Sequence, residues 1–143
     1  MDYGRILDEK MRFETGQSIT GAIGQATCDI AHDLNCAAIL TASATGRTAR
    51  VVSRYRPRAP IICATNRAET YQRLALVWGV QSVMVDMADD SDSMMQASID
   101  AAGKTGLVKN DDIVVLTGGV PVGRPGSTNF IKIHRIGQPL RPE

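Results

Sequence analysis

Residues 36–49 read CAAILTASATGRTA, and this stretch sets the architecture of the 143-residue chain. The apolar run at 36–40 predicts a buried strand, and the small, hydroxyl-rich residues after it predict a tight turn. A helical stretch then begins at Arg47 and ends before Pro57. A strand that passes through a turn directly into a helix is typical of a βαβ unit, so the stretch predicts an α/β fold.

The same alternation continues along the rest of the chain. The pattern predicts strands at 36–40, 61–64, 80–85, 113–116 and 129–136, with helices at 2–13, from 18 onward, and at 47–55, 67–78 and 93–105. Strands that alternate with helices of this length form a largely parallel sheet. The loop at 117–128 has no helical pattern, so the last strand is predicted to return antiparallel at the sheet edge.

Local patterns predict how the helices pack and end. The helix that begins at Ser18 carries one apolar face, made of Ile19, Ile23, Ala26, Ile30 and Leu34. Thr65 and Asn66 are predicted to cap the helix at 67–78, and Gly79 to end it. Gly106 is predicted to end the helix at 93–105.

Composition excludes several classes of function. The net charge is only +1, which gives no reason to expect a nucleic acid or an anionic membrane as partner. No apolar run approaches the roughly 20 residues of a membrane span, so a cytoplasmic protein of one domain, 1–143, is expected. The three cysteines show no metal-ligand spacing and are interpreted as reduced core thiols.

Two charged series are interpreted as surface. The arginines 47, 50 and 54 fall near one helical face without interleaved aromatic residues, so a solvated or salt-bridged surface is favoured over a nucleic-acid stripe. The acidic run at 86–92 lacks the ligand spacing of a calcium loop and is expected to form a loop and a helix N-cap.

The turn at 43–48, which we call the cradle, carries groups that bind an oxyanion. At a helix N-terminus, backbone N–H groups lack intrahelical partners and the helix dipole is positive. Three hydroxyl groups, one guanidinium and two small residues meet there, which is typical of a phosphate site. Its members are Ser43, Ala44, Thr45, Gly46, Arg47 and Thr48. It is not a Walker A loop, and helix capping by Ser43 or Thr45 is the structural alternative.

The glycine-rich loop at 117–128 also leaves the carboxyl end of a predicted strand. Ligands of open α/β sheets bind at those ends, so both loops are expected to face one crevice. Arg124 is the cation expected to reach a ligand. A plain connection is the alternative. The candidate ligand contacts are Gly119, Gly123, Arg124, Gly126, Ser127 and Thr128.

Catalytic patterns are not found in the sequence. Neither His32 nor His134 has a nearby partner pattern that suggests a triad, and paired carboxylates with metal ligands are missing. The domain is therefore expected to bind a ligand without catalysis, and to need no metal or cofactor of its own.

Ordered blocks of the sequence resemble the C-terminal domain of pyruvate kinase, over about 3–137. They are SITGAIGQ at 18–25, AAILT at 37–41, TGRTA at 45–49, YRPRAPII at 55–62 and RLALVWGV at 73–80. GVPVG at 119–123 with GSTN at 126–129 is similar to the Bacillus-type bacterial branch.

The resemblance implies a three-layer α/β/α sandwich with a five-stranded sheet whose last strand is antiparallel. It implies that catalysis, the transfer of phosphate from phosphoenolpyruvate to ADP with Mg²⁺ and K⁺, belongs to a barrel absent from these residues. It assigns residues 43–48 to the phosphate of an allosteric effector and 119–128 to a loop that closes over it. The family is a homotetramer to which this domain contributes contacts, partly through its last strand.

One departure from the family pattern bears on the effector. Members activated by fructose 1,6-bisphosphate use an arginine near the start of the fourth long helix, and residues 92–95 contain none; an accompanying tryptophan is also missing. A sugar monophosphate or AMP is therefore favoured, although Arg124 leaves the bisphosphate open.

Two hypotheses follow. The chain is the regulatory domain of a pyruvate kinase, inactive by itself, or a freestanding phosphometabolite-binding protein of the same fold. The bare Met1-Asp2 start, inside the family's first helix, favours the first.

Overall fold

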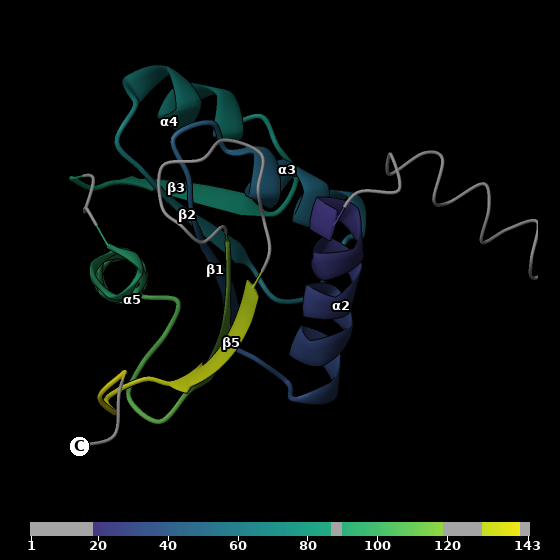
Figure 1. The fold of residues 1–143 in the computed structure, drawn as a ribbon, viewed down its shortest axis with the longest axis vertical. Coiled ribbons are helices and arrows are strands. Elements are labelled where there is room, and N and C mark those ends of the chain that lie inside the picture. Colours follow the sequence, from purple (N-terminus) through teal and green to yellow (C-terminus); the bar gives the residue numbers. More distant parts are fainter. Residues whose placement is uncertain (1–18, 87–89, 119–129, 141–143) are drawn as a thin grey trace, which may run out of the picture.

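The computed structural model describes residues 19–86, 90–118 and 130–140 (Figure 1). The helix expected at 2–13 lies outside these residues. The described elements are α2 (Ile19–Asp33), β1 (Ala38–Ala42), α3 (Arg47–Arg54), β2 (Ile61–Thr65), α4 (Ala68–Leu74), β3 (Val80–Met84), α5 (Ser91–Thr105), β4 (Ile113–Gly118) and β5 (Phe130–Arg135).

The strands form one sheet with the order β3-β2-β1-β4-β5. β1 pairs in parallel with both β2 and β4, so that Thr41 lies between Cys63 and Thr117. β5 pairs antiparallel with β4 at the edge of the sheet. The predicted α/β class, with a mostly parallel sheet and an antiparallel last strand, is confirmed.

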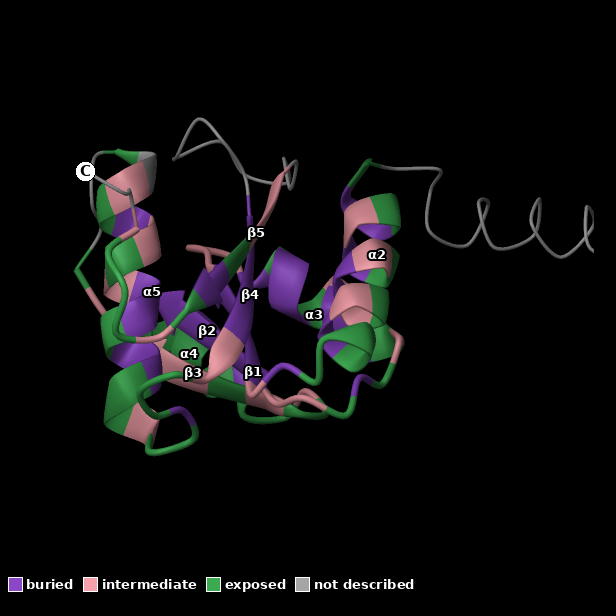
Figure 2. Ribbon diagram, turned by 90° about the horizontal axis from the view of Figure 1, so that it is seen from below, coloured by how far each residue is buried: buried purple, intermediate pink, exposed green. Residues whose placement is uncertain are grey.

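Helices cover both faces of this sheet, which gives three layers (Figure 2). On one face, α2, α3 and Leu74 of α4 enclose a cluster with Ile39, Ile61 and Val115. On the other face, Ile99 and Ala102 of α5 pack against Leu40, Ile62 and Leu116. Strands β1, β2 and β4 are therefore buried on both sides, which explains their near-continuous apolar sequences.

The sheet has a switch point beside β1. The chain adds β2 and then β3 on one side of β1, and α5 returns it to β4 on the other side. Connections that leave β1 and β4 therefore depart in opposite directions, and the carboxyl ends at such a switch point are where open α/β sheets bind ligands.

The buried face of α2 differs from the predicted apolar face. Ile19 is 68% exposed and Leu34 is 44% exposed, whereas Ile30 packs against the core, so only part of the expected face is buried. The buried residues of the helix are small ones, namely Thr20, Gly21, Gly24, Thr27 and Ala31.

Close helix packing is the reason for this choice. A Cβ atom at Gly24 would lie 3.0 Å from Val51 Cγ1 of α3. The two helices are thus so close that glycine, alanine and threonine fit between them where isoleucine would not.

Several element boundaries also differ from the predictions. β1 begins at Ala38 and runs to Ala42. α4 ends at Leu74, and the N–H groups of residues 75–77 each bond to the carbonyl three residues back. Its N-cap is Arg67, without a side-chain cap, although Thr65 Oγ1 accepts the Arg67 N–H at 3.3 Å.

α5 ends where predicted, at Thr105, but begins two residues earlier than predicted, at Ser91. Asp90 is the N-cap, and its carboxylate accepts hydrogen bonds from Ser93 N and Ser93 Oγ, both at 2.8 Å. Gly106 is the C-cap, with a φ of 76°. The acidic run thus contributes a helix cap, as expected from its composition.

Candidate anion site

The cradle lies at the switch point of the sheet. It connects the carboxyl end of β1 to the N-terminus of α3. β4 is the parallel neighbour of β1, so the glycine-rich loop begins at the same edge of the sheet. The expectation that both loops start at one crevice agrees with this topology.

Hydrogen bonds inside the cradle fix the role of Ser43. Its Oγ accepts the N–H of Thr45 at 3.1 Å and the N–H of Gly46 at 3.0 Å. A hydroxyl oxygen has two lone pairs, and these two bonds use both of them. The Ser43 hydroxyl is left to act as a donor, either to Thr45 Oγ1 at 3.3 Å or to a ligand.

Thr45 and Arg47 complete the exposed rim. Thr45 is half-buried, and its Oγ1 accepts the Arg47 N–H at 3.4 Å, so it sits directly over the first turn of α3. Arg47 is exposed, and Thr48 is buried in the same turn. The Ser43 and Thr45 hydroxyls and the exposed residue Arg47 therefore lie next to the positive end of the α3 dipole, a set of groups that attracts an oxyanion.

Gly46 adopts a conformation that requires glycine. Its φ is 73°, in the left-handed region. A Cβ atom there would lie 3.0 Å from Leu74 Cδ2 and 3.1 Å from Thr70 Cγ2. The cradle thus rests directly on α4, a contact that sequence reasoning missed.

Thr70 makes the second contact between α4 and the cradle. Its Oγ1 donates to the carbonyl oxygen of Ala44 at 2.6 Å. The sequence carried one indication of this contact. A threonine inside a helix can bond to a group outside that helix instead of to its own helix backbone.

The glycine-rich loop is described only where it begins and ends. Thr117 Oγ1 donates to Phe130 O at 3.1 Å, and Gly118 lies opposite Phe130 in the β4–β5 ladder. The predicted contacts at 119–128 lie outside the described residues.

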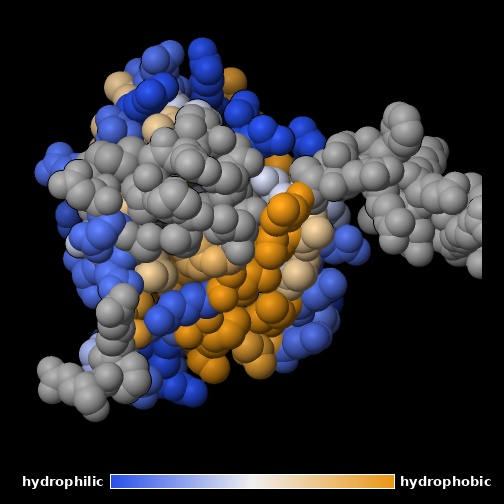
Figure 3. All heavy atoms as spheres, in the orientation of Figure 1, coloured by the Kyte–Doolittle hydropathy of each residue, from blue (hydrophilic) through white to orange (hydrophobic). Residues whose placement is uncertain are grey.

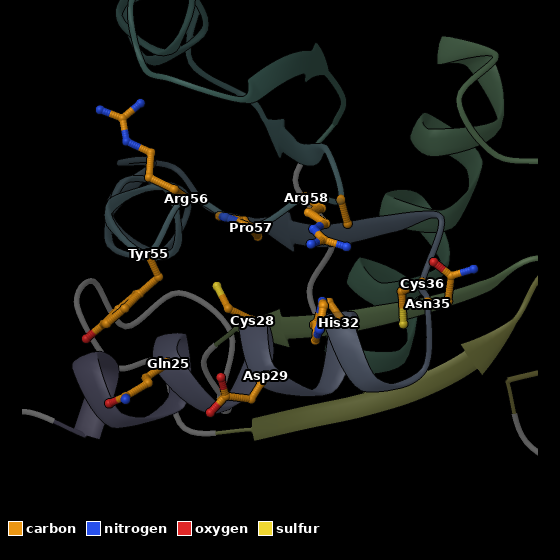
Figure 4. Close-up of a pocket in the computed structure, with 12 residues that line it drawn as sticks. Gln25, Cys28, Asp29, His32, Asn35, Cys36, Tyr55, Arg56, Pro57 and Arg58 are labelled. Atoms are coloured by element: carbon orange, nitrogen blue, oxygen red, sulfur yellow. The ribbon is translucent and has the colours of Figure 1, made fainter.

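A pocket of about 360 Å³ lies at the opposite end of the sheet (Figure 4). It is lined by α2 and by the segments that precede β1 and β2, from Asn35 to Cys36 and from Tyr55 to Ala59. Arg58 and His32 point toward one another across it, whereas Arg56 points away and stacks on the Trp78 ring, 4.7 Å from its centroid. Ligands of open α/β sheets prefer the other end, where the cradle lies.

The three cysteines are free thiols, as predicted. Burial raises the pKa of Cys28 to about 11, with a smaller contribution from Asp29. Burial also raises the pKa of Cys63 to about 11. Both thiols therefore stay protonated at neutral pH and are poor nucleophiles.

Other candidates for chemistry or binding are weak in the described residues. His134 is buried, and burial, with Lys132 nearby, lowers its pKa. Within 19–86, 90–118 and 130–140, His, Cys, Asp and Glu do not gather into a group that could hold a metal ion.

None of the helices in these described ranges has the length and apolar character to cross a lipid bilayer. Arg47, Arg50 and Arg54 are exposed, as expected for a solvated face.

The three-layer fold with this mixed sheet places the chain in the class of α/β/α domains, and comparison with known proteins narrows the class. Residues 21–134 match the family model described as "Pyruvate kinase, alpha/beta domain". The chain is 43% identical over 140 residues to a pyruvate kinase of Geobacillus stearothermophilus, and 38% identical over 140 residues to one of Staphylococcus aureus strain USA300. These alignments cover 98% and 97% of the chain, and 24% of each relative.

A solved structure agrees with the sequence relatives. The crystal structure of a pyruvate kinase from Cryptosporidium parvum matches with a TM-score of 0.73 and 29% identity, over 82% of this chain and 23% of that one. The chain belongs to the pyruvate kinase family and corresponds to its C-terminal α/β domain. It spans about a quarter of the length of the curated relatives it matches.

Proposed function

We propose that this chain is the regulatory domain of a cytoplasmic pyruvate kinase and that its cradle binds the phosphate of an allosteric effector. The observation that carries the proposal is the donor-only Ser43 hydroxyl at the positive end of α3, beside Thr45 and Arg47. Donors without competing acceptors favour a fully ionised oxyanion such as a phosphate monoester.

A ligand with one phosphate fits better than a bisphosphate. The first turn of α5, where family members that bind the bisphosphate carry an arginine, here has Asp92 and no basic residue. A carboxylate at that position would repel a second phosphate. A sugar monophosphate or AMP is therefore the proposed ligand, with the glycine-rich loop 119–128, including Arg124, closing over it.

The catalytic step is assigned to the remainder of the enzyme. Transfer of phosphate from phosphoenolpyruvate to ADP, with its Mg²⁺ and K⁺, would take place in a barrel domain of the same polypeptide. The relatives named above are about four times as long as this chain, which favours a domain of a larger enzyme over a freestanding phosphometabolite-binding protein.

Titration calorimetry tests the ligand assignment. Ribose 5-phosphate, glucose 6-phosphate, AMP and fructose 1,6-bisphosphate are titrated separately into the chain. We expect a single site for at least one monophosphate, and binding at least as tight as that of the bisphosphate. Tighter binding of the bisphosphate would contradict the single-phosphate assignment, and heat from none of the four would contradict the site.

An apolar surface beside the antiparallel strand supports a role in subunit contacts. Ile133 of β5 is 44% exposed, and the exposed Ile19 lies on the neighbouring helix α2. Figure 3 shows the hydrophobic surface that extends over β5 and along α2. Contiguous apolar surface of this kind marks protein–protein contacts.

Self-association of the chain tests this surface. Sedimentation equilibrium is expected to show oligomers that Ile133→Glu dissociates, because burying a carboxylate in an apolar contact is costly. Leu107→Glu, at an exposed leucine after α5, is the matched control and should leave the association unchanged. Equal dissociation by both variants would exclude β5 as the contact.

A further inference from the structure

Thr70 directs its hydroxyl out of its own helix and toward the cradle. Helical threonines commonly bond to the carbonyl four residues back in the same helix. Thr70 is buried, and its Oγ1 instead donates at 2.6 Å to Ala44 O, which is 26 residues earlier in the sequence. The contact therefore ties α4 to the loop that opens α3.

The bond to Ala44 also orients the next N–H group. The carbonyl of Ala44 and the N–H of Thr45 belong to one planar trans peptide unit and point in opposite directions. A carbonyl held toward α4 therefore turns the Thr45 N–H away from α4, where it meets Ser43 Oγ at 3.1 Å.

The Thr45 N–H occupies one lone pair of Ser43 Oγ. The orientation of the Ala44–Thr45 peptide therefore decides whether the Ser43 hydroxyl can accept a further hydrogen bond or can only donate one. With the Gly46 N–H on the second lone pair, Ser43 presents only its hydrogen to an incoming ligand. We propose that Thr70 is a positioning residue that sets the affinity of the cradle for a phosphate monoester by fixing the Ala44–Thr45 peptide. This inference rests on the proposed function of the cradle.

Two substitutions separate the hydroxyl of Thr70 from its methyl group. Thr70→Val keeps the shape of the side chain, including a methyl group where Cγ2 packs near Gly46, but removes the donor. Thr70→Ser keeps the donor and removes the methyl group. If the hydroxyl positions the peptide, only the valine variant loses affinity.

A matched control is available in α2. Thr27 is fully buried, and its Oγ1 donates to Ile23 O at 2.7 Å. Thr27→Val therefore removes a buried hydroxyl-to-carbonyl bond of the same kind, far from the cradle in the sequence. It reports what a general loss of stability does to binding.

The experiment measures the dissociation constant of ribose 5-phosphate by calorimetry for the wild-type chain and the three variants. Since one hydrogen bond contributes roughly 0.5–1.5 kcal/mol, Thr70→Val should bind about three- to tenfold more weakly. Thr70→Ser and Thr27→Val should bind as the wild type does. Amide hydrogen exchange gives a readout without ligand: exchange at Thr45 should accelerate in Thr70→Val only.

The outcomes distinguish the two levels of the proposal. If the wild type binds the ligand but Thr70→Val binds equally well, the positioning role is wrong and the cradle assignment stands. The positioning role is also wrong if Thr27→Val weakens binding as much as Thr70→Val does, or if Thr70→Ser binds as weakly as Thr70→Val. If the wild type binds no phosphate monoester, the assignment of the cradle is itself wrong, and the inference falls with it.

Discussion

Replacing Gly46 with alanine should lower the free energy of unfolding by about 2–5 kcal/mol, the largest effect that we expect from a single methyl group in this chain. The backbone of Gly46 is left-handed, with a φ of 73°, and an L-residue there costs roughly 1–2 kcal/mol. The added Cβ would also press on Leu74 Cδ2 at 3.0 Å. Leu74 is buried in the core, where overpacking adds about 1–3 kcal/mol.

Gly106→Ala is the matched control for this prediction. Gly106 has nearly the same backbone conformation, with a φ of 76°, but a Cβ atom there meets nothing within 4 Å. Its substitution should cost only the conformational part, about 1–2 kcal/mol. Urea denaturation of both variants measures the difference. Equal losses of stability would show that α4 does not constrain the cradle through this contact.

Replacing Thr45 and Arg47 together with alanine should weaken binding of the phosphate ligand by about a hundredfold or more. The double change removes a hydroxyl and the charged group at the rim of the cradle, and hydrogen bonds to a charged partner contribute roughly 1.5–3 kcal/mol each. In a pyruvate kinase that contains this domain, activation by the ligand should be lost.

Calorimetry on the chain and activation assays on the longer enzyme measure the two effects. Arg54→Ala is the control, because it removes the same charge from an exposed position at the other end of α3. Arg54→Ala should change the dissociation constant only slightly, because salt screens the interaction of distant, exposed charges. Activation that persists in the double variant would place the effector outside the cradle.

The sequence predicted those parts of the molecule in which local pattern and tertiary environment agree. The apolar run before Ser43 predicted a buried strand, and the small, hydroxyl-rich residues after it predicted a tight turn into a helix; both predictions are confirmed. The missing helical pattern after β4 predicted the antiparallel return of β5, because a parallel strand needs a long crossover.

The predictions failed where packing overrides hydropathy. In α2, the isoleucine face was the conspicuous one, but the close approach to α3 at Gly24 selects small residues for the interior. In α4, Leu76 and Trp78 continued an apolar pattern, but the chain leaves the helix at Leu74 to reach the parallel strand β3.

The contacts that support the cradle could not be predicted from the sequence. Thr70 and Ala44 are joined only because β2 and α4 fold back beside the cradle, and nothing in the local pattern of either residue indicates the other. The members of the cradle were predictable because they are consecutive. The contact of α4 with the cradle could not be predicted, because it forms only in the tertiary structure.

The close contact between α2 and α3 joins two surfaces of the domain. Val51 of α3 packs against Gly24, where an added Cβ atom would lie 3.0 Å from Val51 Cγ1. α3 begins at the cradle, whereas α2 borders the apolar surface over β5. The pair of packed helices therefore forms a continuous stretch of structure between the cradle, at the start of α3, and the exposed apolar surface beside α2.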